Sequence, residues 1–208
     1  MDAADDSWVV LVPVKSLAEA KTRLVGAEDR ADLALAFACD TVAAAASVAR
    51  VVVVTDDPVV AAAVRETGAD VLPQGPEPGL NAALRHAADD VRGRDPRSRI
   101  AVLAGDLPAL RPDEVSAALG AAAAHPRAFV CDAEGTGTTF LAVAAGVGLD
   151  PRFGPRSRAA HRASGAVELR LADVSGLRRD VDDEIGLWDA RRLGVGPRTL
   201  AALERTGA

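Results

Sequence analysis

The sequence predicts an α/β fold, in which helices cover both faces of a mostly parallel sheet, and three observations support this. Short apolar runs alternate along the chain with amphipathic stretches of helix length, the order that builds parallel sheets. Two later apolar runs are separated by too few residues for a crossover helix, which predicts one antiparallel excursion. With 208 residues and 49% hydrophobic content, the chain fits one domain with a substantial core. We therefore expect a single-domain, Rossmann-like three-layer sandwich over residues 1–208.

The first half of the chain holds four apolar runs, each followed by a stretch with helical periodicity. The runs consist largely of valine, isoleucine, leucine and alanine, as in strands that are buried on both faces. We expect strands at 8–14, 50–57, 69–73 and 99–106, and helices at 28–48, 58–67, 80–92 and 112–124.

The second half breaks this alternation. The runs at 128–134 and 138–145 form the expected antiparallel pair, because the few residues between them leave no room for a helix. A polar stretch at 150–171 contains a helix that opens at FGPRS (153–157) and leads to one more strand. The tail at 182–208 predicts two short helices.

Composition and charge exclude several classes of protein. The net charge of −6 supplies no basic field for a nucleic-acid surface. No apolar run reaches transmembrane length, and the acidic N-terminus lacks a signal peptide's apolar segment, so we expect a cytoplasmic protein without a membrane partner. Cys39 and Cys131 lack metal or disulfide spacing and are expected to be small buried side chains. The oligomeric state is left open.

Only two of the chain's 24 basic residues are lysines, and both follow the first predicted strand. Lys15 comes directly after that apolar run, and Lys21 lies six residues further on with Arg23 nearby. Ligands of open α/β sheets bind at the carboxyl ends of the strands, and compact ammonium groups there suit a polyphosphate. The alternative is chance in an arginine-rich chain.

The segment IAVLAGDLPAL (100–110) ends a predicted buried strand in Asp106. A carboxylate at that position is well placed to hold Mg²⁺ against substrate phosphates. The alternative is a helix cap, but Pro112 and Asp113 mark the next helix start several residues later. Further carboxylates of the late segment RRDVDDEIGL could complete a metal site or cap the following helix: Asp180, Asp182, Asp183 and Glu184.

Two other segments at the same predicted sheet edge could contact a nucleotide. Thr55 and Asp56 end the second strand, whereas Asp57 before Pro58 is expected to cap the following helix. In the glycine- and proline-rich loop before the third helix, Gly79 allows close backbone approach to a ligand. Asn81 could bind a base or ribose, although a plain turn with a capping Asn explains the same residues.

The motifs GTGTT (135–139) and FGPRS (153–157) predict an anion site. Glycine beside serine or threonine at a helix N-terminus offers free N–H groups and a favourable dipole, and neighbouring arginines add positive charge. The alternative is a solvated loop with a capping serine. The chain has no GxGxxG fingerprint, no P-loop, no GxSxG elbow and no evident Ser-His-Asp set.

Together these motifs resemble one family closely. VPVKSLAEAKTRL, VVVTDDP, GLNAAL, LAGDLPAL, GTGTTFL, FGPRSRAAHRASGA and DVDD occur in the order seen in the 2-phospho-L-lactate guanylyltransferases and their phosphoenolpyruvate-using bacterial relatives. Those enzymes make the phosphodiester precursor of the deazaflavin coenzyme F-420. The resemblance covers nearly the whole chain and implies a nucleotide-diphosphosugar-transferase-like fold, GTP and phosphoenolpyruvate as substrates, Mg²⁺ as cofactor and pyrophosphate release.

The resemblance also implies roles for individual residues. The phospho-acid would be held by Thr139, Gly154 and Ser157. The chemistry of the implied transfer adds Mg²⁺ on Asp106 and Asp182, with Lys21 and Arg23 stabilising the departing pyrophosphate. The implied nucleotide contacts are Val14, Lys15, Thr55, Asp56, Gly79 and Asn81. The family's late motif is commonly DVDT, so Asp183 here is a departure.

Other functions stay open at this point. The acceptor could be 2-phospho-L-lactate or 3-phosphoglycerate, and another enzyme of this fold would act on CTP or a sugar phosphate. A nucleotide sensor without turnover is the non-enzyme alternative, although it would need neither metal carboxylates nor a second-substrate motif. A phosphate acceptor is already largely dianionic near pH 7, so no general base is required, and the role of His161 is undecided.

Overall fold

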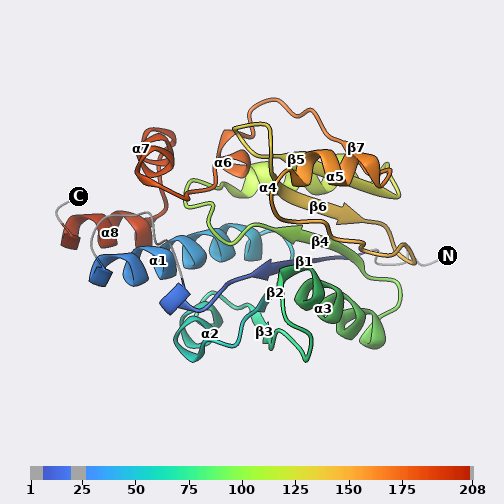
Figure 1. Ribbon diagram of the computed structural model, residues 1–208, viewed down its shortest axis with the longest axis horizontal. Coiled ribbons are helices and arrows are strands. Elements are labelled where there is room, and N and C mark those ends of the chain that lie inside the picture. Colours follow the sequence, from blue (N-terminus) through green and yellow to red (C-terminus); the bar gives the residue numbers. More distant parts are fainter. Residues whose placement is uncertain (1–6, 20–26, 207–208) are drawn as a thin grey trace.

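The computed structural model describes residues 7–19 and 27–206. The described part of the chain forms one seven-stranded sheet in the order β3-β2-β1-β4-β6-β5-β7 (Figure 1). The strands are β1 (Trp8–Pro13), β2 (Arg50–Val54), β3 (Asp70–Leu72), β4 (Arg99–Leu103), β5 (Arg127–Cys131), β6 (Thr138–Val143) and β7 (Val167–Glu168).

The sheet is parallel except at one strand. β1 lies between β2 and β4 and is parallel to both, β2 pairs in parallel with β3, and β5 pairs in parallel with β7. β6 is antiparallel to β4 on one side and to β5 on the other. In Figure 1 its arrow accordingly points opposite to that of β1. The predicted antiparallel excursion is confirmed.

Helices cover the sheet on both faces. The helices are α1 (Ala27–Ala46), α2 (Pro58–Arg65), α3 (Leu80–Arg94), α4 (Pro112–Ala122), α5 (Ser157–Ala163), α6 (Ser175–Arg178), α7 (Glu184–Leu193) and α8 (Pro197–Thr206), with a 3₁₀ turn η1 at Leu17–Glu19. Buried side chains of α1, α2 and α4 pack on one face, and those of α3 pack on the other. The predicted three-layer α/β arrangement is confirmed.

The uninterrupted apolar runs of the strands follow from this layering. Successive side chains of a strand point to opposite faces. In β1, Val10 and Val12 join the core beneath α1, whereas Val9 and Leu11 join the core beneath α3. A strand covered on both sides therefore has no position for a polar side chain.

The C-terminal helices close one end of the molecule. α8 lies beside α1, and α7 lies next to it at the same end (Figure 1). A separate apolar cluster joins these helices, in which Phe37 of α1 packs with Ala190 of α7 and Leu203 of α8. Both predicted tail helices are confirmed. No helix in the described part of the chain is long and apolar enough to cross a membrane.

Candidate active site

A cleft of about 520 Å³ lies at the carboxyl ends of β1 and β2, beside the N-terminus of α3. The chain runs outward from β1 through β2 to β3 and then returns to β4 on the other side of β1, so the strand order reverses at β1. Ligands of open α/β sheets bind at such a reversal. Four of the predicted nucleotide contacts line the cleft: Val14, Lys15, Asp56 and Gly79. The structure therefore brings these four residues together around one cavity.

The wall formed by β1 is fixed by backbone contacts. Val14 N–H donates to the Val54 carbonyl at 3.0 Å, which continues the β1–β2 pairing past the end of the strand. On the other side of β1, a Cβ on Gly105 would lie 2.7 Å from the Pro13 carbonyl oxygen. Glycine is therefore required at this position if the loop after β4, which carries Asp106, is to lie against the end of β1.

Asp57 organises the turn beside the cleft. As predicted, it caps α2, with Oδ1 accepting from Val59 N–H at 2.9 Å, and its Oδ2 also accepts from Leu17 N–H at 2.9 Å. The bond from Leu17 is the main cause that holds the pKa of Asp57 below its usual range. Thr55 is buried, its hydroxyl accepts from Asp57 N–H at 3.1 Å, and it does not line the cleft.

α3 presents its N-terminus to the cleft. Gly79 is the N-cap residue with φ of 103°, and no atom lies within 4 Å of a Cβ built on it. Gly79 has no side chain with which to cap this helix, so among the described residues the first N–H groups are available as donors, and the helix dipole favours an anion there. Asn81, two residues after Gly79 and still in the first turn of α3, does not line the cleft, because its side-chain amide is bonded to the backbone of Phe153.

A group of carboxylates lies on the β4 side. Val181 N–H donates to the Asp106 carbonyl at 3.1 Å, which holds the segment at 180–182 against the loop after β4. Burial raises the pKa of Asp180 to about 7, and the neighbouring carboxylates of Asp106 and Asp182 add to the rise. Such a concentration of negative oxygen ligands fits a hard divalent cation.

These carboxylates do not make a complete protein-only metal site. Within residues 7–19 and 27–206, no three side chains of His, Cys, Asp or Glu converge closely enough to hold a metal ion. Mg²⁺ is commonly held by one or two carboxylates together with substrate phosphates, so a pair of aspartates fits it. Asp183 has a structural role, because its Oδ1 caps α7 by accepting from Gly186 N–H at 2.9 Å. Threonine also favours N-cap positions, so the departure from DVDT at Asp183 keeps a residue type suited to capping.

The predicted phospho-acid residues lie next to the loop that carries Asp106. Ala104 N–H, two residues before Asp106, donates to the Thr139 carbonyl at 2.8 Å. The Thr139 side chain is 1% exposed, and its hydroxyl has no hydrogen-bond partner among the described residues. Buried hydroxyl groups are normally satisfied, so this one is a candidate for contact with a substrate.

Gly154 and Ser157 form the turn that begins α5. Ser157 is the first residue of the helix, it is buried, and its N–H donates to the Gly154 carbonyl at 3.1 Å. Gly154 has φ of 128°, a conformation that disfavours any residue with a side chain. The structure therefore places these two residues together, as the FGPRS motif predicts.

Sequence reasoning missed Asp132, which shapes the turn before Thr139. Its Oδ1 accepts from Thr136 N–H at 2.9 Å and its Oδ2 from Gly137 N–H at 2.6 Å. A Cβ on Gly137 would collide with this carboxylate. The signal was present, because an Asp before a glycine- and threonine-rich stretch is typical of a side chain that bonds its own turn. Lys21 and Arg23 lie outside the described residues.

Comparisons with known proteins agree with this geometry. Residues 8–167 match the family model described as "Guanylyl transferase CofC like". A phosphoenolpyruvate guanylyltransferase of Streptomyces scabiei is 57% identical over 208 residues, covering 95% of this chain and 96% of the relative. Another protein of that name, from Thermomonospora curvata, is 50% identical over 210 residues, covering 99% and 92%.

Solved structures extend the likeness to the fold. A protein from Desulfovibrio desulfuricans G20, described as a nucleotide-diphospho-sugar transferase, superposes with a TM-score of 0.71 at 17% identity, covering 96% of this chain and 94% of that one. Rv0371c of Mycobacterium tuberculosis H37Rv, in complex with manganese, has a TM-score of 0.54 at 25% identity, with 90% and 97% covered. The predicted nucleotide-diphosphosugar-transferase fold is thereby confirmed. By the extent of the family match and the identity to its relatives, the chain belongs to the CofC-like guanylyl transferase family.

Proposed function

We propose that this protein transfers GMP from GTP to the phosphate of phosphoenolpyruvate, giving enolpyruvyl-diphospho-guanosine and pyrophosphate for coenzyme F-420 biosynthesis. The near-full-length relatives that bear this enzyme's name support the choice of both substrates. The structural observation that carries the proposal is the buried hydroxyl of Thr139 beside the Asp106 loop, which has no hydrogen-bond partner within residues 7–19 and 27–206.

GTP would occupy the cleft at the ends of β1 and β2. Val14 and Lys15 line it from the β1 side, Asp56 from β2, and Gly79 from the N-terminus of α3. Asp56 also accepts from Gln74 N–H at 3.1 Å, which stiffens the loop on that wall. The exposed ammonium of Lys15 is then available as a point charge for phosphate oxygens.

Phosphoenolpyruvate would be held by residues of β6 and of the turn before α5. The Thr139 hydroxyl would donate to its phosphate or carboxylate, and Ser157 with the Gly154 backbone would contact it from the turn. The hydrogen bond from Ala104 N–H to the Thr139 carbonyl supports this assignment, because it joins β6 to the loop that carries Asp106. The acceptor phosphate can then approach the α-phosphate of a nucleotide in the cleft.

The reaction would be a direct displacement. A phosphate oxygen of phosphoenolpyruvate attacks the α-phosphorus of GTP, the bond to the β-phosphate oxygen breaks, and pyrophosphate leaves. The attacking phosphate is already largely dianionic near pH 7, so the protein needs no general base. Its task is to position the two anions and to neutralise charge as it develops. We assign stabilisation of the departing pyrophosphate to Lys21 and Arg23, and assistance to Lys15.

A divalent cation fits the aspartate group. Asp106 and Asp182 would hold Mg²⁺. Asp180 lies beside them, and its pKa is raised by burial and also by the carboxylates of Asp106 and Asp182 nearby. The bound cation would neutralise charge on the phosphates of both substrates. Manganese in the Rv0371c structure supports a divalent metal on this fold.

The test is pyrophosphate release by the purified protein with Mg²⁺, GTP and one phospho-acid at a time: phosphoenolpyruvate, 2-phospho-L-lactate or 3-phosphoglycerate. We expect release with phosphoenolpyruvate, at a rate reduced by about 10²-fold or more in Asp106→Asn. The matched control, Asp113→Asn, removes an exposed carboxylate of α4 and should leave the rate unchanged. Preference for another acid would change the acceptor. Absence of release with all three acids, and also with ATP or CTP in place of GTP, would overturn the enzymatic assignment.

A further inference from the structure

The segment 150–156, here termed the acceptor loop, carries Gly154 and leads into Ser157, yet it has little regular structure of its own. It must nevertheless hold a small acceptor in fixed geometry. Three polar side chains from outside the loop are bonded to its backbone: Asn81 of α3, His161 of α5 and Arg127 of β5.

Asn81 holds the loop at Phe153, the residue before Gly154. Its Nδ2 donates to the Phe153 carbonyl at 2.9 Å, and its Oδ1 accepts from the Phe153 N–H at 2.9 Å. Both polar ends of the amide are therefore used on one residue 72 positions away in the chain. The pairing also fixes the orientation of the amide, because only one assignment of its oxygen and nitrogen satisfies both bonds.

His161 holds the loop at Arg152. Its ring is fully buried, and its Nε2 accepts a hydrogen bond from the Arg152 N–H at 2.9 Å. An accepting Nε2 carries no proton, so the neutral ring has its proton on Nδ1. That proton is donated to the Thr138 hydroxyl at 3.0 Å, next to Thr139. One imidazole thus connects the acceptor loop, α5 and β6, the three segments that supply Gly154, Ser157 and Thr139.

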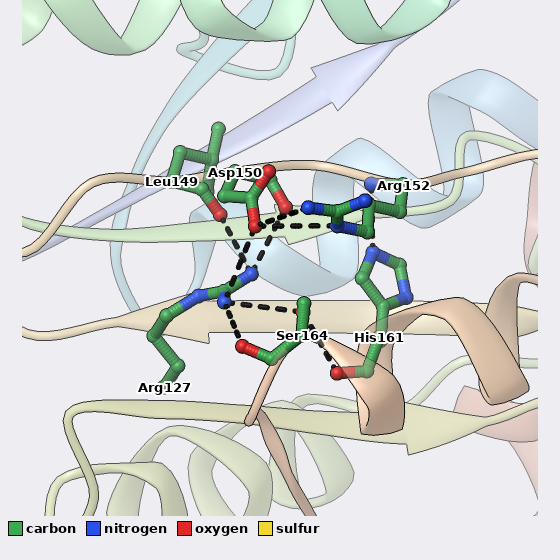
Figure 2. A network of polar contacts seen from close by, with 6 residues as sticks. All are labelled: Arg127, Leu149, Asp150, Arg152, His161 and Ser164. Atoms are coloured by element: carbon green, nitrogen blue, oxygen red, sulfur yellow. Dashed lines mark hydrogen bonds and ion pairs between the residues drawn. The ribbon is translucent and has the colours of Figure 1, made fainter.

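Arg127 holds the beginning of the loop through its guanidinium group (Figure 2). Its Nη2 donates to the Asp150 carbonyl at 2.9 Å, and its Nη1 donates to the carbonyl and hydroxyl of Ser164 at 3.0 and 3.1 Å. The Ser164 hydroxyl in turn donates to the His161 carbonyl at 2.8 Å. The end of α5 and the start of the loop are thereby tied to β5.

We infer that Asn81 and His161 are positioning residues for the phospho-acid. Asn81 holds the acceptor loop at Phe153, and His161 holds it at Arg152. Asn81 lies only two residues after Gly79, which lines the nucleotide cleft. This inference rests on the proposed function. It replaces the expected contact of Asn81 with a base or ribose. The GLNAAL motif would then serve both substrates, because α3 begins at the nucleotide cleft and supports the acceptor loop within its first turn.

The first experiment compares the two Michaelis constants in Asn81→Leu. Leucine is similar in size but makes neither hydrogen bond, so the Phe153 peptide loses both partners. We expect KM for phosphoenolpyruvate to rise about tenfold to hundredfold while KM for GTP stays within about twofold. Glu77→Gln, an exposed change near the rim of the cleft, is the control and should alter neither constant. A rise confined to KM for GTP would overturn the inference and restore the nucleotide contact.

A pair of His161 variants tests whether this side chain positions the acceptor loop or only fills space in the core. Glutamine can place an acceptor near the position of Nε2 and keep the bond from Arg152, whereas asparagine reaches only the Nδ1 side. We expect His161→Gln to retain a near-normal KM for phosphoenolpyruvate and His161→Asn to raise it about tenfold. Equal constants in the two variants, with equal melting temperatures, would contradict the inference.

Amide hydrogen exchange tests the positioning without reference to activity. In Asn81→Leu, peptides covering 150–157 should exchange about tenfold faster or more than in the natural protein, whereas peptides from β1 and β4 should not change. Unchanged exchange at 150–157 would overturn the inference even if the enzyme were active. If the natural protein released no pyrophosphate with phosphoenolpyruvate, the proposed function would fail, and the exchange result would still decide whether these residues hold the loop.

Discussion

His161 is the residue whose chemistry depends most on its surroundings. Burial is the main cause that lowers its pKa to about 4, and the nearby guanidinium groups of Arg127 and Arg152 act in the same direction, against the carboxylate of Asp150. Both ring nitrogens are engaged in hydrogen bonds, and the one that Nε2 accepts from Arg152 N–H requires the neutral form. At neutral pH the ring therefore serves as a fixed connector and not as an acid.

This burial makes the stability of the protein depend on pH. The pKa of histidine is about 6.5 in the unfolded chain and about 4 in the folded protein, so between these values the unfolded state binds the extra proton. The contribution of the neutral ring is complete above pH 6.5 and is lost as the pH falls towards 4. We expect the free energy of unfolding, measured with urea, to fall by about 2 kcal/mol from pH 7 to pH 5 through this group.

His161→Gln is the control for that slope, because glutamine does not titrate. The variant should lose less stability than the natural protein over the same pH interval, by about 2 kcal/mol. If the two proteins lost equal stability between pH 7 and pH 5, groups other than His161 would cause the loss. The account of His161 as a buried neutral ring would then be wrong.

Gly105 tests the close approach of the loops after β1 and β4. In Gly105→Ala the new Cβ would lie 2.7 Å from the Pro13 carbonyl, so one of the two loops must move. Asp106 would move with it, and we expect kcat/KM to fall about 10²-fold, as for small misplacements of catalytic groups. Gly120→Ala in α4 is the matched control, since nothing lies near its added Cβ. That variant should keep full activity, and equal losses in both would refute the account.

At the scale of elements, α8 is attached to α1 by a buried carboxylate. Asp40 is 7% exposed and accepts from the N–H groups of Arg198 at 3.1 Å and Thr199 at 2.7 Å, in the first turn of α8. A Cβ on Gly196 would collide with this carboxylate, so the glycine allows the helix to begin there. Asp40 thus acts as an N-cap supplied by a distant helix.

Replacement of Asp40 by alanine should lower the free energy of unfolding by about 1–2 kcal/mol, the usual cost of a lost N-cap. Urea unfolding measures this directly. Glu66→Ala is the control: it removes the exposed ion pair with Arg198 and should cost less than about 0.5 kcal/mol. Equal effects of the two substitutions would show that Asp40 does not cap α8.

Local chemistry made much of the element order predictable. Proline marked the starts of α2 and α4, at Pro58 and Pro112, and the expected cap Asp57 of α2 is the observed one. The predicted second strand, 50–57, was too long because its last residues form that cap and β2 ends at Val54. Such errors arise where a polar turn follows a strand without any break in extended conformation.

The partner of Asn81 could not be predicted in the same way. An Asn in the first turn of a helix after a glycine is compatible with a cap, a turn or a ligand contact. Its observed partner is Phe153, 72 residues later, which only the packing of α3 and the acceptor loop on the same face brings within reach. For the same reason, a role for His161 could not be derived from its place in a helical pattern.

At the scale of the whole molecule, strand order creates the site. β4 lies between β1 and β6, so the loop that carries Asp106 is flanked by the nucleotide cleft on one side and by Thr139 on the other. The sequence predicted that β6 would be antiparallel, from the short connection after β5. It did not predict that β6 would lie between β4 and β5, because a short connection specifies the neighbour on one side only.

The central claim is that phosphoenolpyruvate accepts GMP from GTP and keeps its own phosphate. Phosphoenolpyruvate labelled with ¹⁸O in its phosphate would be incubated with GTP, Mg²⁺ and the enzyme, and the products would be analysed by mass spectrometry and ³¹P NMR. If its phosphate attacks the α-phosphorus of GTP, all of the label appears in the guanosine product and none in pyrophosphate. Label in pyrophosphate or in free phosphate would mean that phosphoenolpyruvate gives up its phosphate instead of accepting GMP, and would contradict the account.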